Sequence, residues 1–432
     1  MARPKKNAAQ AQDTLLTLDT VPEIPVEEQP YPLPEGWKWV RLGSLCSLRN
    51  GKAFKPTDWS ESGLPIVRIQ NLNSPNNKFN YYDGIIEDKF LINSGDLLFA
   101  WSGTPGTSFG AHIWKGGKAL LNQHIFRVDF EKKIILKIFF KYAINYRLNE
   151  FIVKAHGGAG LQHITKRNFE NTSIPLPPLE VQQRIVERIE TLFAKLDEAR
   201  EKAESVLESF ELRKAAILHK AFTGELTAKW RKEKGIQLNW EEKQLADIGS
   251  IVTGSTPSTK HHEYYGDAIP FIKPADLNSG RFVNQASEYL SKEGGKISRS
   301  VRAGSTCVCC IGTIGKCGFL TCDATTNQQI NTICPYNFMD DLFVYYYCTS
   351  IKFKEMLINS SYSTTISIIN KSKMSILPIP VPHLSEQQKI VRILDRIFAR
   401  EQQAREAAEN VLQRIDQMKK AILARAFRGE LG

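Results

Sequence analysis

Three short segments carry residue types that could support chemistry. Gly312-Thr-Ile-Gly-Lys-Cys317 has the glycines and lysine of a phosphate-binding loop, but it is too short and ends in cysteine where a magnesium-binding Ser or Thr belongs. Glu87-Asp-Lys89 could end a nuclease motif, although a solvated turn explains such a short match. Leu176-Pro-Pro-Leu179 lacks the amide or carboxylate with which amino-methyltransferases hold the target amine. We therefore expect no catalytic residue in this chain, and no enzyme activity of its own.

The cysteines could in principle bind zinc, because seven of the eight lie between Cys307 and Cys348. However, Cys307, Cys309 and Cys310 belong to an apolar run without a Cys-x-x-Cys pair. Buried free cysteine packs as a small hydrophobic residue. We expect strand core at these positions and no metal site.

Composition indicates a globular chain with a polyanionic partner. The 432 residues are enough for two or three domains, and the formal charge is +11. No apolar run is long enough to span a membrane and the N-terminus lacks a secretion signal, so we expect a cytoplasmic protein with no membrane partner. Residues 31–178 hold 19 Lys and Arg against 11 Asp and Glu, whereas residues 235–383 hold 13 against 12. If both regions touch DNA, the first should contribute more to phosphate binding.

An internal repeat organises these residues. Ile174-Pro-Leu-Pro-Pro-Leu-Glu-Val-Gln-Gln-Arg-Ile-Val186 returns as Ile379-Pro-Val-Pro-His-Leu-Ser-Glu-Gln-Gln-Lys-Ile-Val391, an offset of 205 residues that holds to the end of the chain. Upstream the match is fainter, but Gly51 corresponds to Gly254 and Asn122-Gln-His-Ile125 to Asn327-Gln-Gln-Ile330. The order is therefore variable domain, shared helix, variable domain, shared helix.

Each shared segment predicts a long helix that begins after its prolines, because proline is disfavoured inside a helix. Apolar residues then alternate at spacings of four and three, which is typical of a coiled-coil seam. The first seam is Ile185, Ile189, Leu192, Leu196, Ala199, Ala203, Val206 and Phe210, and the second is Ile390, Leu394, Ile397, Glu401, Ala404, Ala408, Val411 and Ile415. Glu401 breaks the second seam as a register point or as an exit from the pair. Each helix should be on the order of 65 Å long and should end at Gly224 or Gly429.

The predicted fold class is mixed α+β: two α/β domains alternate with two long helices that pair as an antiparallel coiled coil with pseudo-twofold symmetry. We expect a disordered tail over residues 1–30, domains over 31–178 and 228–378, and helical segments over 179–227 and 379–432. Short strands are expected around Ile66–Ile69, Asp96–Phe99 and Phe126–Phe130, and a helix from Ile134 to Ala155. Two such domains on one helical pair could read two short sequences at a fixed separation, as dimeric DNA-binding proteins do.

These motifs resemble the specificity subunits of type I restriction-modification enzymes. The resemblance covers nearly all of the chain from Trp37 onward and is strongest in the proline-rich motif, the following Gln-Gln and Ile-Val, and the closing Ala-Phe-x-Gly-Glu-Leu. The family usually has Pro-Pro-Leu-x-Glu-Gln, whereas this chain has Val181 in place of the Glu in one copy and His383 in place of a Pro in the other. These departures leave open whether the motif touches a partner.

The resemblance implies that the variable regions are target recognition domains, each reading half of an interrupted, asymmetric site in double-stranded DNA. Two methyltransferase subunits would dock on the coiled coil, and two restriction-translocase subunits would join them. No cofactor is expected in this chain; S-adenosylmethionine, ATP and Mg would belong to the partner subunits.

Base edges and phosphates are contacted by Arg, Lys, Asn, Gln and short hydroxyl side chains on loops. The candidates that fit this description are Arg68, Gln70, Asn71, Gln162, His163 and Lys166 in the first domain, and Thr256, Lys260, Lys273, Thr364, Thr365 and Lys371 in the second. An ordinary solvated surface role remains open for each of them.

Two alternatives remain. One is the recognition subunit of a methylation-only or combined restriction system, which would have other partners. The other is a coiled-coil scaffold whose globular ends bind proteins, and the near-neutral second domain fits it.

Overall fold

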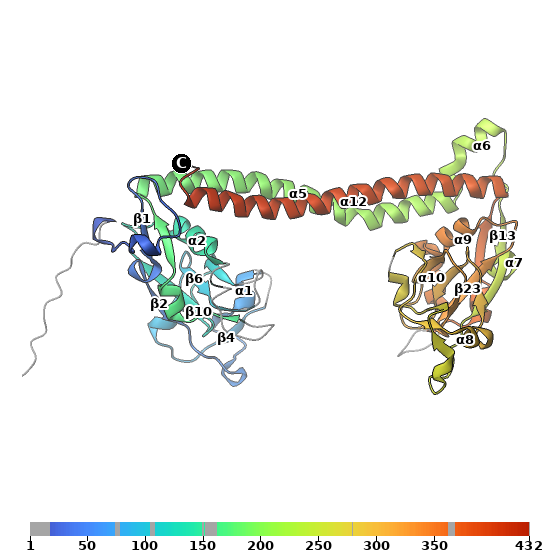
Figure 1. Ribbon diagram of the computed structural model, residues 1–432, viewed down its shortest axis with the longest axis horizontal. Coiled ribbons are helices and arrows are strands. Elements are labelled where there is room, and N and C mark those ends of the chain that lie inside the picture. Colours follow the sequence, from blue (N-terminus) through green and yellow to red (C-terminus); the bar gives the residue numbers. More distant parts are fainter. Residues whose placement is uncertain are drawn as a thin grey trace, which may run out of the picture. The chain divides into compact units, whose positions relative to one another are not determined.

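The computed structural model describes residues 18–73, 78–103, 109–148, 151, 162–278, 280–361 and 368–431. The chain forms two units, and each contains one α/β domain with parts of both long helices. Unit 1 comprises residues 1–201 and 411–432, and unit 2 comprises residues 202–410. The predicted fold class is confirmed: two mixed α/β domains alternate with two long helices (Figure 1).

Unit 1 contains two four-stranded sheets and two strand pairs. The first sheet has the order β2-β10-β6-β8: Cys46–Asn50, Ile125–Phe130, Leu97–Ala100 and Gly110–Ile113. The second has the order β4-β3-β9-β5: Asn80–Tyr82, Leu64–Val67, Ala119–Leu121 and Leu91–Ile92. β1 (Lys38–Arg41) pairs with β12 (Ser173–Leu176), and β7 (Ser102–Gly103) with β11 (Gln162–His163). The helices of the domain are α1 (Ile69–Asn73), α2 (Lys137–Tyr146) and α4 (Lys166–Glu170).

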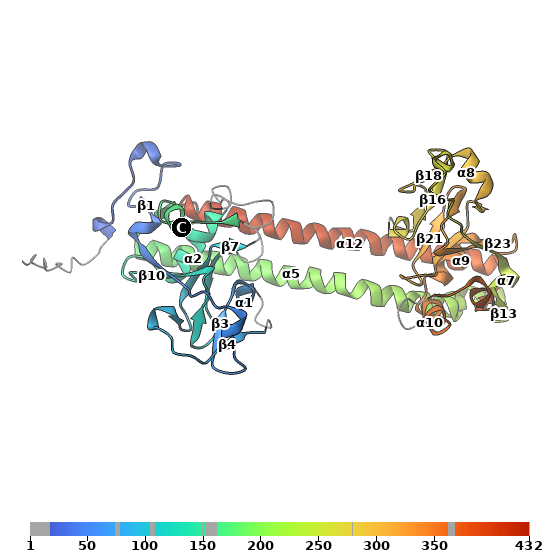
Figure 2. The same ribbon diagram turned by 90° about the horizontal axis from the view of Figure 1, so that it is seen from below.

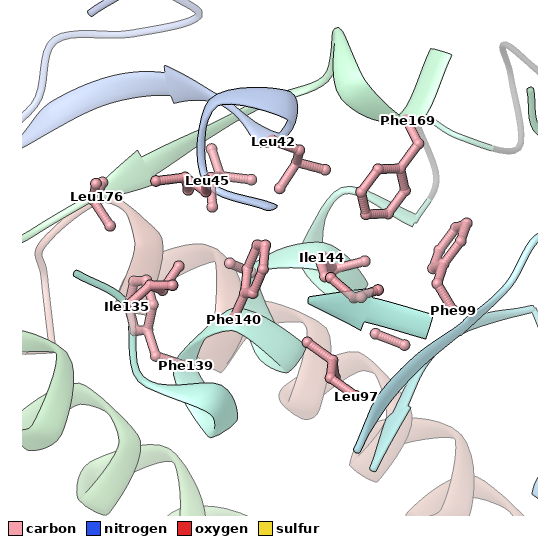
Figure 3. Close-up of a cluster of buried hydrophobic side chains, with 14 of the residues drawn as sticks. Leu42, Leu45, Leu97, Phe99, Ile135, Phe139, Phe140, Ile144, Phe169 and Leu176 are labelled. Carbon is pink, nitrogen blue, oxygen red and sulfur yellow. The ribbon is translucent and has the colours of Figure 1, made fainter. Parts of the chain in front are cut away.

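The main core of unit 1 lies where α2 and α4 meet the first sheet (Figure 3). Phe139, Phe140 and Ile144 of α2 are fully buried together with Phe99 of β6 and Phe169 of α4. Both faces of β6 are buried, which explains why its sequence is uninterruptedly apolar. The loops that follow these strands are therefore held on a rigid base.

Unit 2 repeats the two sheets, each with one extra edge strand, and one of the two strand pairs. One sheet is β14-β23-β20-β21-β17: Gly249–Thr253, Ile330–Pro335, Thr306–Cys309, Cys317–Leu320 and Phe282–Val283. The other is β15-β18-β16-β22-β19: Tyr265–Gly266, Tyr289–Leu290, Ile269–Ile272, Ala324–Thr326 and Ser300–Val301. β13 (Glu241–Gln244) pairs with β24 (Pro378–Val381). The helices are α6 (Ala228–Lys234), α7 (Leu245–Ile248), α8 (Lys292–Ile297), α9 (Asp341–Cys348), α10 (Ile351–Asn359) and α11 (Lys371–Ser375).

The clustered cysteines lie in the core of unit 2, as predicted. Cys307 and Cys309 belong to β20 and are buried, and Cys310 follows them. Burial raises the pKa of the Cys307 and Cys310 thiols to about 12, so both are neutral near pH 7 and pack as apolar groups.

The long helices are α5 (Leu179–Phe222) and α12 (Leu384–Phe427), each of 44 residues. α5 starts directly after Pro178 and α12 one residue after Pro382, and Gly224 and Gly429 follow their ends with φ of 81° and 79°. Because this backbone region favours glycine, both glycines stop the helix where predicted. No helix in the described ranges is long and apolar enough to cross a bilayer.

The two helices run antiparallel within each unit (Figures 1 and 2). In unit 1, Lys419 Nζ lies 2.5 Å from Asp197 Oδ1, and Arg200 pairs with Asp416. In unit 2, Arg213 Nη2 lies 2.8 Å from Glu401 Oε2. Glu401 is therefore a cross-helix pairing point, which resolves the ambiguity at the break in the second seam.

The seam residues divide into two groups by their surroundings. Ile185 and Ile189 in unit 1, and Ile390 and Leu394 in unit 2, are fully buried and belong to the cores of their own domains. Leu192, Leu196 and Ile397 are half-buried, and Val411 is 41% exposed. The last turns also join the cores, through Leu218 and Ala221 of α5 in unit 2 and Ala426 and Phe427 of α12 in unit 1. Between the helix ends, the seam residues Ala203, Phe210, Ala408 and Ile415 are buried as well, so only part of the seam stays accessible.

A glutamine in each proline-rich motif joins its helix to the domain. Gln182 Nε2 donates to Ile134 O (2.9 Å) and Pro177 O (2.8 Å), and its Oε1 accepts from Leu136 N (2.8 Å). Gln387 makes the equivalent bonds with Pro382 O (2.9 Å) and Asp340 N (2.8 Å). Both glutamines are buried. This part of the motif is internal to the fold.

Two expectations about local structure were wrong in extent. The helix expected over 134–155 begins only at Lys137, because the Gln182 side chain binds the backbone of Ile134 and Leu136; residues 152–155 lie outside the described ranges. The expected N-terminal tail packs from residue 18 onward, where Val21 and Ile24 are buried. The segment is rich in proline and acidic residues, which favoured the prediction of a tail. Residues 1–17 lie outside the described ranges.

Candidate functional site

A polar loop follows the central parallel strand in both domains: Asn122–His124 after β9, and Asn327–Gln329 after β22. Asn122 N bonds Val67 O at 3.1 Å, and Asn327 N bonds Ile272 O at 3.1 Å. Each loop closes with the same turn, Ile125 N to Asn122 O and Ile330 N to Asn327 O, both at 3.1 Å. One chain therefore builds the same loop twice.

A glycine backs each loop. Gly51 N donates to Ile125 O (3.3 Å) and Gly254 N to Ile330 O (3.0 Å). A Cβ at Gly51 would collide with the backbone oxygen of Asn122, and one at Gly254 with that of Asn327. The close approach explains why glycine stands at both positions.

The loop side chains divide into a buried anchor and an exposed group. Asn122 and Asn327 are buried, whereas Gln123 and Gln328 are exposed. An exposed glutamine can donate to and accept from DNA. The site prediction missed Gln123 and Gln328, although the repeated Asn-Gln was visible in the sequence and could have pointed to them.

Arg68 and Gln70 line a hollow of about 200 Å³ beside the first loop, together with Trp59, Gln123 and His124. Arg68 Nη1 donates to Asn80 Oδ1 at 3.1 Å, and its guanidinium carbon lies 5.7 Å from the centre of the Trp59 ring. The structure thus brings two of the predicted residues together with the loop.

Asn71 has a different environment from the other candidates in the first domain. It is 5% exposed, and its Oδ1 accepts from Arg68 N at 3.0 Å. In the second domain Asp276 Oδ2 accepts from Lys273 N at 2.7 Å in the same way. Asn71 therefore shapes the turn that carries Arg68, and we place it outside the set of proposed DNA contacts.

The remaining candidates of the first domain lie on two neighbouring segments. Gln162 and His163 form β11, beside β7; Trp101, which precedes β7, donates its amide to His124 O (3.3 Å). Lys166 is exposed at the start of α4, where Nζ approaches Leu48 O (3.4 Å) and Glu170 (3.7 Å).

In the second domain, Thr256 and Lys273 flank the loop. Thr256 donates its hydroxyl to Gln328 Oε1, and Lys273 Nζ forms an ion pair with Glu288. Tyr265 donates to Pro257 O (2.7 Å), and desolvation raises the pKa of its hydroxyl, so it stays protonated.

The other second-domain candidates are less directly placed. Lys260 is exposed in the turn that leads to Tyr264, and Lys371 is exposed at the start of α11, whose N-cap is Asn370. No interaction between either lysine and the loop is seen in the described residues. Thr364 and Thr365 lie outside the described ranges.

Two equivalent α/β domains with matched polar loops, joined by two long helices, define a two-headed recognition protein. The family model described as "Type I restriction modification DNA specificity domain" matches residues 34–208 and again residues 237–413. The chain belongs to this family and is a DNA-specificity subunit of the type I restriction-modification kind.

Similar proteins cover almost the whole chain. The EcoBI specificity subunit of Escherichia coli is 27% identical, over 92% of this chain and 86% of its own length. The StySPI specificity subunit of Salmonella potsdam is 25% identical, over 92% of this chain and 90% of its own length.

Two solved structures share the fold. A chain from a structure of complex assembly and conformational transition of the type I R-M system has a TM-score of 0.72 at 22% identity and covers 93% of this chain and 100% of its own. The HsdS subunit from Thermoanaerobacter tengcongensis has a TM-score of 0.57 at 22% identity. The match covers 93% of this chain and 99% of that subunit.

Proposed function

We propose that this specificity subunit reads a two-part DNA sequence, one half with each domain, on behalf of catalytic partner subunits. The observation that carries the proposal is the duplicated loop, Asn122–His124 and Asn327–Gln329, in the same backbone setting in both domains. Different side chains on the same scaffold suit two different half-sites. The 44-residue helices suit a spacer between them.

The residues we assign to DNA are Arg68, Gln70, Gln123 and His124 in the first domain, and Thr256, Lys273 and Gln328 in the second. Gln162, His163, Lys166, Lys260, Thr364, Thr365 and Lys371 remain candidates for phosphate or base contacts on the surrounding segments. Loop side chains contact phosphates for position and base edges for sequence.

The chemistry is assigned to partners. Two methyltransferase subunits would bind the accessible faces of α5 and α12, where Leu212 and Met418 are 76% and 52% exposed. Two restriction-translocase subunits would complete the assembly. S-adenosylmethionine, ATP and Mg would be bound by these partners, and this chain would be a non-catalytic subunit that works in the cytoplasm with the DNA.

The test is to co-express the chain with a methyltransferase subunit that co-purifies with it, expose a plasmid pool, and map the methylated adenines. A single interrupted motif with a constant gap is expected. Methylation at scattered positions by an intact complex would contradict the proposal and favour the coiled-coil scaffold with protein-binding ends. Purification of the complex without added subunits would identify which partners it carries, including those of a methylation-only system.

A further inference from the structure

Arg68 and Lys273 occupy equivalent positions, and each has a neighbour at an equivalent position. Pro65 lies opposite Tyr81 in the β3–β4 pair, and Pro270 lies opposite Tyr289 in the β16–β18 pair. Asn80 and Glu288 each come one residue before these tyrosines. Arg68 bonds Asn80, and Lys273 bonds Glu288. The two domains therefore present two chemically different pairs at one place in the fold.

The first pair is a cation held by a neutral amide. Arg68 donates to Asn80 Oδ1 and lies over the Trp59 ring, and among the described residues no carboxylate lies within ion-pair distance of it. An arginine has five N–H donors, so one bond to Asn80 leaves others for a ligand. The adjoining hollow also contains Gln70, Gln123 and His124.

The second pair is a lysine neutralised by a carboxylate. The side chains of Lys273 and Glu288 are each 38% exposed, so both reach solvent while paired. The backbone setting matches that of Arg68, because Asp276 accepts from Lys273 N as Asn71 does from Arg68 N. The backbone settings of the two cations are therefore alike, whereas the side chains of the two pairs differ.

A phosphate contact does not explain this difference. Phosphates are alike in both half-sites, and a carboxylate next to a phosphate-binding lysine would repel the ligand. Base edges differ between half-sites in their donors and acceptors, and carboxylates do accept from the amino groups of bases. The first pair offers hydrogen-bond donors on a cation, and the second offers an exposed carboxylate as an acceptor. Two different base edges require this difference.

We infer that Arg68 with Asn80, and Lys273 with Glu288, are equivalent specificity-determining pairs, an inference that rests on the proposed function. Arg68 donates to the acceptor edge of a guanine, O6 and N7, in the first half-site. Glu288 accepts from the exocyclic amino group of a cytosine or adenine in the second, and Lys273 holds the carboxylate in position.

The test exchanges the pairs within the full chain, in complex with its methyltransferase subunit. Arg68→Lys with Asn80→Glu installs the second pair in the first domain, and Lys273→Arg with Glu288→Asn does the reverse. Each exchange should lower methylation of DNA sites that carry the original base pair at the recognised position. The expected loss is about 10-fold relative to sites that carry another base pair there. The change should affect one position of one half-site, and the other half-site and the gap should stay the same.

The unaltered half-site is an internal control for folding and assembly. Lys132→Ala is the surface control. Lys132 is exposed and follows β10, whereas the loop precedes this strand. The variant should leave the motif unchanged. The single changes Arg68→Gln and Glu288→Gln provide a second route if an exchanged pair lowers thermal stability. They should lower the selectivity for one base pair at the same positions of the motif.

Two results would overturn the inference. One is slower methylation at all sites with an unchanged motif and a shallower salt dependence, which is the behaviour of a phosphate contact. The other is an unchanged motif and rate in both exchanges. Failure of the proposed function is separate, because it would already show in the unmodified chain as the lack of a two-part motif.

Discussion

Arg231 of α6 donates to the Glu386 carboxylate at the start of α12, and both side chains are almost fully buried, at 9% and 4% exposure. Glu386 also accepts from Thr227 Oγ1 (2.6 Å) and Trp240 Nε1 (3.1 Å). In the first copy the position of Glu386 holds Val181. Val181 stands there as an apolar residue packed against the core of unit 1, so the buried carboxylate network belongs to unit 2.

Removing Glu386 should strongly destabilise unit 2. Glu386→Val leaves the Arg231 guanidinium buried without its carboxylate, which we expect to cost about 3 kcal/mol or more in the free energy of unfolding. Arg231→Met added to Glu386→Val should recover much of that loss. Urea unfolding of the full chain measures both, and equal stability of the single and double variants would show that the pair is not coupled.

The Arg213–Glu401 pair should contribute less, because its side chains are 40% and 28% exposed. The equivalent positions in unit 1 are Met418 and Leu196. A double-mutant cycle with Arg213→Met and Glu401→Leu should give a coupling energy of about 0.5–1 kcal/mol that shrinks in high salt. Coupling that does not depend on salt would point to packing, including that of Arg213 on Phe210, instead of charge.

Gly51→Ala and Gly254→Ala should each disturb one loop. The added methyl group meets the backbone of Asn122 or Asn327, and relief of the overlap should cost roughly 1–3 kcal/mol. We expect each variant to have a lower melting temperature. Each should also methylate DNA more poorly, because it recognises the half-site of its own domain less well. Gly117→Ala is the matched control, since a Cβ there meets nothing within 4 Å; a similar loss in that variant would contradict the argument.

Lys52 should account for part of the stronger phosphate binding expected of the first domain. Its amide bonds Leu121 O at 2.8 Å, as Ser255 N bonds Thr326 O at 2.9 Å, so lysine and serine occupy equivalent positions. Lys52→Ser should make the salt dependence of DNA affinity shallower by about one unit in the log–log slope, and Ser255→Lys should make it steeper by the same amount. Titrations at several salt concentrations measure the slope, and a changed recognition motif would instead identify Lys52 as a base contact.

The repeat, the two helix ends and the fold class could be predicted from the amino-acid sequence. These features depend on local rules: proline excludes helix before Leu179 and Leu384, glycine stops it at Gly224 and Gly429, and apolar spacing sets the seam. The burial of Cys307 and Cys309 also followed from their apolar neighbours. The packing of Val21 did not, because the core that it joins is built from residues far away in the sequence.

Which polar residues lie together depends on the folding of distant segments against one another. Asn71 is as polar as Gln70, yet one is buried in a turn and the other lines the hollow. Asn80 and Glu288 could not be recognised as equivalent, because 15 residues separate Lys273 from Glu288 whereas 12 separate Arg68 from Asn80. Strand pairing sets which of these side chains meet, and pairing depends on contacts between distant segments that periodicity does not encode.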